Sequence, residues 1–150
     1  LSDEQFLAFL DAALTRSAMP ADLLCFEITE TAAIGNLSRA VQFFNTMRAR
    51  GCRFALDDFG SGLSSFGYLR TLPVDFLKID GLFVRDCVED PIDLAMVRSI
   101  NDIGHVMGIK TVAEFAESKA IEEKMREIGI DYAQGFGISE PLPLQDFLLA

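Results

Sequence analysis

The chain has 150 residues, half of them hydrophobic, and a formal net charge of −10. This length suits one domain with a sizeable core, and the acidic balance argues against a surface that wraps nucleic acid. The sequence has neither a signal peptide nor an apolar run of about 18 residues, so we expect no membrane contact by this segment, although a longer parent protein could be anchored. Three cysteines without metal-ligand spacing indicate free thiols in a reducing, cytoplasmic compartment; they are Cys25, Cys52 and Cys87.

Helical and extended patterns alternate along the whole chain. In chain order, the expected elements are a helix over residues 2–16, a strand over 23–28, a helix over 37–50, a strand over 53–58, a loop over 60–72, a strand over 74–80, a connector over 81–90, a helix over 91–107, a strand over 109–113, a helix over 118–128, a strand over 130–135 and a last helix from 144 to 149. Ser2 or Asp3 is the expected cap of the first helix, and Asn36 or Ser38 that of the second. Five strands that alternate with helices predict an α/β fold with a parallel sheet.

Polar residues recur where the predicted strands end, and they are Glu27, Asp57, Lys78, Glu114 and Gln134. The carboxyl ends of parallel strands form the active-site rim of a TIM barrel. An open doubly wound sheet would place its ligand at the same edge. A Gly-x-Gly-x-x-Gly pattern that opens a helix is absent from the sequence, which disfavours a dinucleotide fold.

The adjacent acids Asp57 and Asp58 follow the apolar run Phe54-Ala55-Leu56 and precede a glycine-rich turn. Such a pair at the end of a buried strand is costly unless a cation lies beside it, and hard divalent cations prefer oxygen ligands. The alternative is a helix N-cap aspartate beside a solvated one. Lys78 must emerge on the opposite face from Leu77 and Ile79 because strand side chains alternate.

Five short motifs occur in order along the chain: Glu27-Ile28-Thr29-Glu30, Asp57-Asp58-Phe59-Gly60-Ser61-Gly62, Leu77-Lys78-Ile79-Asp80, Thr111-Val112-Ala113-Glu114 through Glu117, and Gln134-Gly135-Phe136. Their order and separations resemble the EAL family of cyclic-di-GMP phosphodiesterases over essentially all 150 residues. The resemblance implies a TIM-barrel-like domain, two divalent ions (Mg²⁺ or Mn²⁺), and hydrolysis of the second messenger cyclic di-GMP to linear pGpG.

The resemblance also assigns roles to individual residues of this chain. The implied metal ligands are Glu27, Asp57, Asp58 and Glu114, with Asp57 bridging both ions. Lys78 matches the lysine beside the attacking water and the scissile phosphate, and Gln134 matches a residue near the same centre. Glu30 matches the glutamate that holds the loop from Asp58 to Tyr68, and Glu117 matches a supporting acid.

Each of these residues also has a structural alternative. Glu27 and Glu30 could be solvated acids at a strand end, Glu114 could be a helix-start acid, and Gln134 could simply end a strand. Asn36 is interpreted as a helix cap or loop residue, and His105 is given no role.

The sequence departs from the family pattern at two points. The tripeptide Glu-Ala-Leu is absent, and five strands cannot close an eight-stranded barrel. We therefore expect the chain to be the C-terminal part of one EAL domain, an incomplete barrel whose open edges are completed or covered by a homodimer. The resemblance also implies a second kind of interface, because intact EAL domains commonly pair through the segments that correspond to residues 60–68 and 81–88. The second departure is Phe115-Ala116, where the family usually has Gly-Val.

Three functions are compatible with these features. The parent protein could be a cyclic-di-GMP phosphodiesterase, with this chain inactive by itself. It could instead be a sensor that binds cyclic di-GMP without cleaving it, or the chain could be a dimerisation module. A diguanylate cyclase (GGDEF) domain or a sensor domain could precede it in the parent protein.

Overall fold

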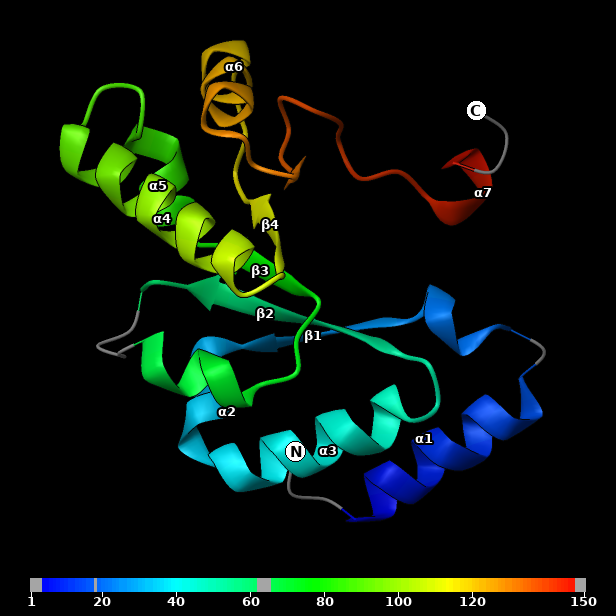
Figure 1. Cartoon of the computed structure of the whole chain (residues 1–150). Coiled ribbons are helices and arrows are strands. Elements are labelled where there is room, and N and C mark those ends of the chain that lie inside the picture. Colours follow the sequence, from blue (N-terminus) through cyan, green and yellow to red (C-terminus); the bar gives the residue numbers. More distant parts are fainter. Residues whose placement is uncertain (1–3, 18, 62–65, 148–150) are drawn as a thin grey trace.

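The computed structural model describes residues 4–17, 19–61 and 66–147, which contain one five-stranded sheet (Figure 1). Its strands are β1 (Cys25–Thr29), β2 (Arg53–Phe59), β3 (Phe76–Ile79), β4 (Lys110–Ala113) and β5 (Tyr132–Ala133). Each strand pairs in parallel with the next strand along the chain, without the reversal of order that marks a doubly wound sheet. The predicted parallel α/β architecture is confirmed, and in the described part of the chain the sheet is not closed into a barrel.

Helices connect the strands and cover the outer face of the sheet (Figure 1). The α-helices are α1 (Glu4–Arg16), α2 (Glu30–Gly35), α3 (Leu37–Arg48), α4 (Gly81–Asp86), α5 (Pro91–Val106), α6 (Lys119–Ile128) and α7 (Leu144–Phe147). Two 3₁₀ helices span Ala21–Leu23 and Phe66–Thr71. None of the helices in the described ranges combines the length and the apolar character that a membrane span requires.

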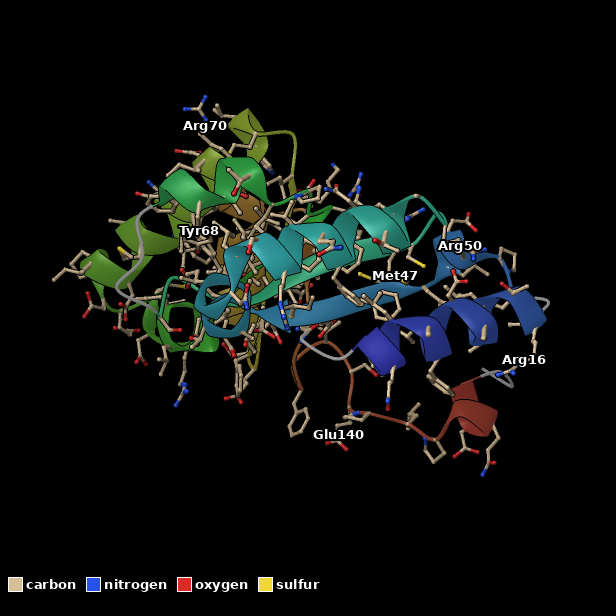
Figure 2. All side chains as sticks on the ribbon, turned by 90° about the horizontal axis from the view of Figure 1, so that it is seen from below. Arg16, Met47, Arg50, Tyr68, Arg70 and Glu140 are labelled. Atoms are coloured by element: carbon tan, nitrogen blue, oxygen red, sulfur yellow. The ribbon has the colours of Figure 1, made fainter. Side chains whose placement is uncertain are left out.

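The core lies between the sheet and these helices. Phe44 of α3 stacks on Phe54 of β2 with ring centroids 4.3 Å apart, and neither side chain is exposed. Leu56, two residues further along β2, is also fully buried, because alternate strand residues share one face. Figure 2 shows α3 and α1 packed beside the strands, with Met47 of α3 buried and Arg70 and Glu140 pointing away from the ribbon. The opposite face of the sheet carries both polar and apolar strand residues, among them Glu27, Lys78 and Phe76.

Two short helices differ from the sequence prediction. The sequence predicted no helix between the strand that ends at residue 28 and the helix that begins at residue 37, but α2 begins at Glu30 because the Thr29 side chain accepts a hydrogen bond from the Ala32 amide. The connector that begins at residue 81 opens as α4, because the Asp80 carboxylate accepts the Leu82 amide at 2.8 Å. The predicted Asn36 cap is confirmed, since its side chain accepts the Arg39 amide. The proposed caps Ser2 and Asp3, residues 62–65 of the loop, and residues 148–150 lie outside the described residues.

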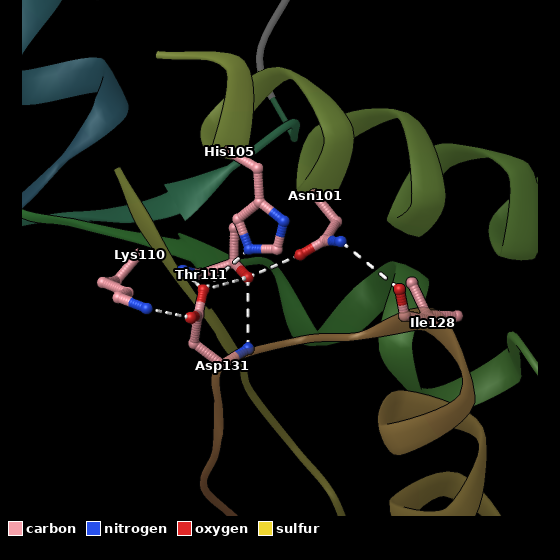
Figure 3. Close-up of polar contacts among 6 residues, drawn as sticks. All are labelled: Asn101, His105, Lys110, Thr111, Ile128 and Asp131. Atoms are coloured by element: carbon pink, nitrogen blue, oxygen red, sulfur yellow. Dashed lines mark hydrogen bonds and ion pairs between the residues drawn. The ribbon is translucent and has the colours of Figure 1, made fainter. Parts of the chain in front are cut away.

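A polar network lies at the amino-terminal ends of β4 and β5, where these strands meet α5 (Figure 3). Asp131 accepts hydrogen bonds from Lys110 Nζ at 2.6 Å and from the Thr111 amide at 2.9 Å, and it lies 2.8 Å from His105 Nε2. The Thr111 hydroxyl is fully buried and donates to Asn101 Oδ1 at 2.6 Å. His105, to which the sequence assigned no role, thus belongs to a network that ties α5 to two strands.

We expect Asp131→Asn to lower the free energy of unfolding at pH 7 by about 1.5–3 kcal/mol, the usual value of hydrogen bonds to a charged group. Burial alone would raise the pKa of Asp131, but hydrogen bonds from Lys110, Thr111 and His105 outweigh it and hold that pKa well below its ordinary value. A depressed carboxyl pKa stabilises the fold above the unfolded-state value of about 3.9 and loses this effect as the pH falls towards the folded-state value.

Urea unfolding of the wild type and of Asp131→Asn, between neutral and strongly acidic pH, measures the difference in their free energies of unfolding. The stability difference should be constant above about pH 5 and shrink below about pH 4. A difference that stays constant down to acidic pH would contradict the assignment. Glu123→Gln, at an exposed carboxylate of α6, is the matched control and should change stability by no more than about 0.5 kcal/mol.

Candidate metal centre

Lys78 lies at the centre of an acidic cluster on the inner face of the sheet. Its neighbours Leu77 and Ile79 are fully buried on the helix side, so the alternation of β3 directs the Lys78 side chain to the other face, as predicted. Only 4% of the residue is exposed. Its Nζ atom contacts three carboxylate oxygens from three other strands or strand ends: Asp57 Oδ1 at 2.8 Å, Glu27 Oε2 at 2.9 Å and Glu114 Oε1 at 2.9 Å.

The three carboxylates determine the charge state of this lysine. Burial by itself would lower the pKa of Lys78, but the contacts with Asp57, Glu114 and Glu27 outweigh it and raise that pKa above its ordinary value. The side chain is therefore a fixed ammonium at neutral pH. In the metal-free protein it places one positive charge among the three carboxylates.

Asp57 and Asp58 converge because of an irregularity in β2. Leu56 pairs with Leu77 and Phe59 with Ile79, so β2 has one more residue than β3 between these pairs. Asp58 also has a left-handed backbone with φ of 53°, which aspartate tolerates better than most residues. Such a bulge redirects side chains that would otherwise alternate, and it brings both carboxylates to the same edge.

Glu114 completes this edge from the residue that follows β4. Its amide donates to Ile79 O at 3.3 Å, and the residue is 7% exposed. Burial raises the pKa of Glu114, and the Lys78 ammonium opposes that rise. Gln134, directly after β5, donates from Nε2 to Glu114 Oε1 at 3.1 Å and so orients the carboxylate. The helix-start interpretation of Glu114 was wrong, because α6 begins at Lys119 with Ser118 as its cap.

The donor set fits a hard divalent cation. One carboxylate oxygen from each of Asp57, Asp58 and Glu114 lies within 4.8 Å of the other two. Asp57 Oδ1 is buried, and its contact with Lys78 lacks hydrogen-bond geometry, so this oxygen has no hydrogen bond among the described residues. Burial, Asp57 and Asp80 raise the pKa of Asp58. A cation would relieve this crowding of acids, and oxygen-only donors suit Mg²⁺ or Mn²⁺. The N-cap interpretation of the aspartate pair was wrong, because β2 continues through Phe59.

Glu27 lies beside this group on β1. Its side chain is 54% exposed and reaches the cluster through Lys78. Both residues line a cavity of about 320 Å³ along the inner face of the sheet, together with Gln134. Glu27 is thus available to a ligand in that cavity without being buried among the other acids.

Glu30 anchors the turn that follows the two aspartates. The residue is 3% exposed, so it is not the solvated acid of the alternative interpretation. Its Oε2 accepts the Gly60 amide at 3.1 Å, and its Oε1 accepts the Tyr68 hydroxyl. Burial and the bond to Glu30 raise the pKa of Tyr68, so its hydroxyl remains a donor. Glu117, in contrast, is exposed and lines a separate cavity of about 420 Å³ with Phe115, Gln134 and Phe136.

A parallel β/α sheet with acids and a buried lysine at the carboxyl ends of its strands defines a TIM-barrel-like domain with a candidate site for divalent cations. The chain belongs to the EAL-domain family, since the family profile described as "EAL domain" matches residues 1–141. Solved EAL domains share this fold. The Mycobacterium smegmatis DcpA EAL domain superposes with a TM-score of 0.91 at 30% identity, over 99% of this chain and 67% of that chain.

Two curated relatives and one further structure extend the comparison. "Cyclic di-GMP phosphodiesterase PdeB" of Shewanella oneidensis is 51% identical over 129 residues, which are 86% of this chain and 15% of the relative. "Cyclic di-GMP phosphodiesterase PdeA" of Borreliella burgdorferi is 40% identical over 144 residues, 96% of this chain and 22% of the relative. The solved structure "PaMucR Phosphodiesterase, c-di-GMP complex" has a TM-score of 0.91 at 31% identity, over 97% of this chain and 59% of that chain. The chain thus spans less than a quarter of either curated relative.

Proposed function

We propose that this chain is the C-terminal part of an EAL domain that hydrolyses cyclic di-GMP to linear pGpG with divalent metal ions. The observation that carries the proposal is the convergence of Asp57, Asp58 and Glu114 around the buried Lys78 ammonium. The names of the curated relatives support it, and so does the MucR structure, which is a complex with cyclic di-GMP.

The contacts of the site residues support the following roles. Asp57, Asp58 and Glu114 would hold Mg²⁺ or Mn²⁺, with Glu27 beside them. When bound, such ions polarise a phosphate and lower the pKa of a water molecule. The Lys78 ammonium offsets the negative charge that develops on the phosphate oxygens during attack.

Two further residues keep this arrangement rigid. Gln134 holds one oxygen of Glu114, and Glu30 fixes the turn after Asp58 through Gly60 and Tyr68. Preorganised charges act on the transition state without a reorganisation cost, so this rigidity contributes to the rate.

Turnover of cyclic di-GMP tests the proposal, in MgCl₂ and in MnCl₂, with excess EDTA as the control. Both this chain and a longer protein that includes it should be assayed, because the chain covers 59% of the matched MucR structure. We expect metal-dependent pGpG formation by the longer protein and little by the 150 residues alone. Binding of cyclic di-GMP without pGpG formation would identify a sensor, and the absence of both would overturn the proposal.

We also propose that the isolated chain forms a homodimer, and that a GGDEF or sensor domain precedes it in the parent protein. The outer edges of β1 and β5 have no partner strand in the described residues, and open edges favour pairing with another chain. A relative from Pseudomonas aeruginosa, MucR, is named a bifunctional diguanylate cyclase and phosphodiesterase.

A further inference from the structure

The short helix α4 contacts both acid-bearing segments of the metal centre. On one side, Phe83 packs on Gly60, where an added Cβ would lie 2.9 Å from Phe83 Cε2. On the other side, the ring of Phe115 covers Gly81, where an added Cβ would lie 2.1 Å from Phe115 Cδ2. The turn after Asp58 and the segment after Glu114 are therefore supported by one element.

Phe115 has an unusual backbone for a large side chain. Its φ is 52°, in the left-handed region, which is strained for a bulky residue and free of strain for glycine. A strained residue persists only where its surroundings compensate, and strain of this kind gathers at functional sites.

The compensation comes from the ring. Phe115 lies against the buried Gly81, and the Arg85 guanidinium carbon is 5.7 Å from the ring centroid, within cation–π range. Half of the residue remains exposed. These side-chain contacts join the segment that follows β4 to the helix α4.

The backbone amides on either side of Phe115 donate hydrogen bonds to neighbouring segments. The Glu114 amide donates to Ile79 O at 3.3 Å, and the Ala116 amide donates to Gln134 O at 3.0 Å. The first of these bonds is long, and it is the backbone contact next to the Glu114 carboxylate. Phe115 lies between the Glu114 and Ala116 amides in the chain. The packing of its ring on α4 therefore restrains both of these hydrogen bonds.

We propose that Phe115 is a positioning residue: by packing on Gly81 and Arg85 it fixes the segment 114–116, so that the Glu114 carboxylate faces Lys78 and the two aspartates. The contact also requires glycine at position 81, because any side chain on Gly81 would displace the Phe115 ring. The consequence for catalysis rests on the proposed function, whereas the positioning itself does not.

A double-mutant cycle tests the contact, with Gly81→Ala, Phe115→Gly and the two combined. The readout is amide hydrogen exchange of Glu114 and Ala116 in the metal-free protein, with the amides of β1 and β2 as the internal reference. Each single variant should accelerate exchange at Glu114 and Ala116 about tenfold while the reference amides stay unchanged. In the Phe115→Gly background, Gly81→Ala should have no further effect, because the ring that it displaces is gone. Phe115→Tyr, which keeps the ring, should behave as the wild type.

Calorimetric titration with MnCl₂ adds a second readout, in which Phe115→Gly and Gly81→Ala should weaken binding about 10–100-fold, as supporting residues of metal ligands do. Unchanged exchange at Glu114 in Phe115→Gly would overturn the proposal, and so would additive effects in the double variant. Acceleration that extends equally to β1 and β2 would also overturn it, since this shows general destabilisation. Hydrogen exchange needs neither metal nor nucleotide, so the positioning can hold even where cyclic di-GMP is not hydrolysed.

Discussion

Lys78→Met is expected to lower the free energy of unfolding of the metal-free protein by about 3–5 kcal/mol, the cost of removing one partner from a buried ion cluster. Methionine keeps the length of the side chain but leaves Asp57, Glu114 and Glu27 without the cation that they surround at 2.8–2.9 Å. Urea unfolding at pH 7 in EDTA measures the loss.

Addition of MnCl₂ separates this explanation from a packing defect. A divalent ion can replace the missing ammonium, and a ligand that binds the folded state raises its stability. Mn²⁺ should therefore stabilise Lys78→Met more than it stabilises the wild type, although pGpG formation remains impaired. Equal stability of Lys78→Met and wild type in EDTA would show that the cluster does not depend on the lysine. The control is Lys119→Met at an exposed lysine, with an expected change within about 0.5 kcal/mol.

In the longer protein that includes this chain, Asp57→Asn is expected to reduce the turnover of cyclic di-GMP about 1000-fold, since metal ions supply several kcal/mol of transition-state stabilisation and each 1.36 kcal/mol is a factor of ten. Asparagine has nearly the same shape, so the bulge in β2 should persist. It removes the charge of a carboxylate that lies beside both Asp58 and Glu114.

Steady-state turnover and MnCl₂ titration of the same variant measure this effect. Mn²⁺ affinity should fall together with the rate, while unfolding by urea stays close to wild type, because the loss of one charge also relieves the crowding of acids. Turnover within about tenfold of wild type, less than about 1.4 kcal/mol, would remove Asp57 from the ligand set. Asp102→Asn, at an exposed residue of α5, is the matched control and should leave both quantities unchanged.

The sequence alone was sufficient for the order of the five strands and the longer helices and for the inward direction of Lys78. Both depend on local periodicity: apolar positions repeat with the period of the helix or strand, and Lys78 lies between two apolar neighbours. The Asn36 cap is equally local, because the side chain bonds to an amide three residues away. The polar residues at the strand ends met at one edge because parallel strands place their carboxyl ends there.

Only the tertiary structure decided how these residues meet. Alternation along a strand would have placed Asp57 and Asp58 on opposite faces, and the extra residue that unites them exists only in the register between β2 and β3. The partners of Glu30 lie 30 and 38 residues away in sequence. The packing of the Phe115 ring on Gly81 likewise joins segments that share no local sequence pattern. Local periodicity carries no information about such contacts, because they depend on how separate strands and helices align after folding.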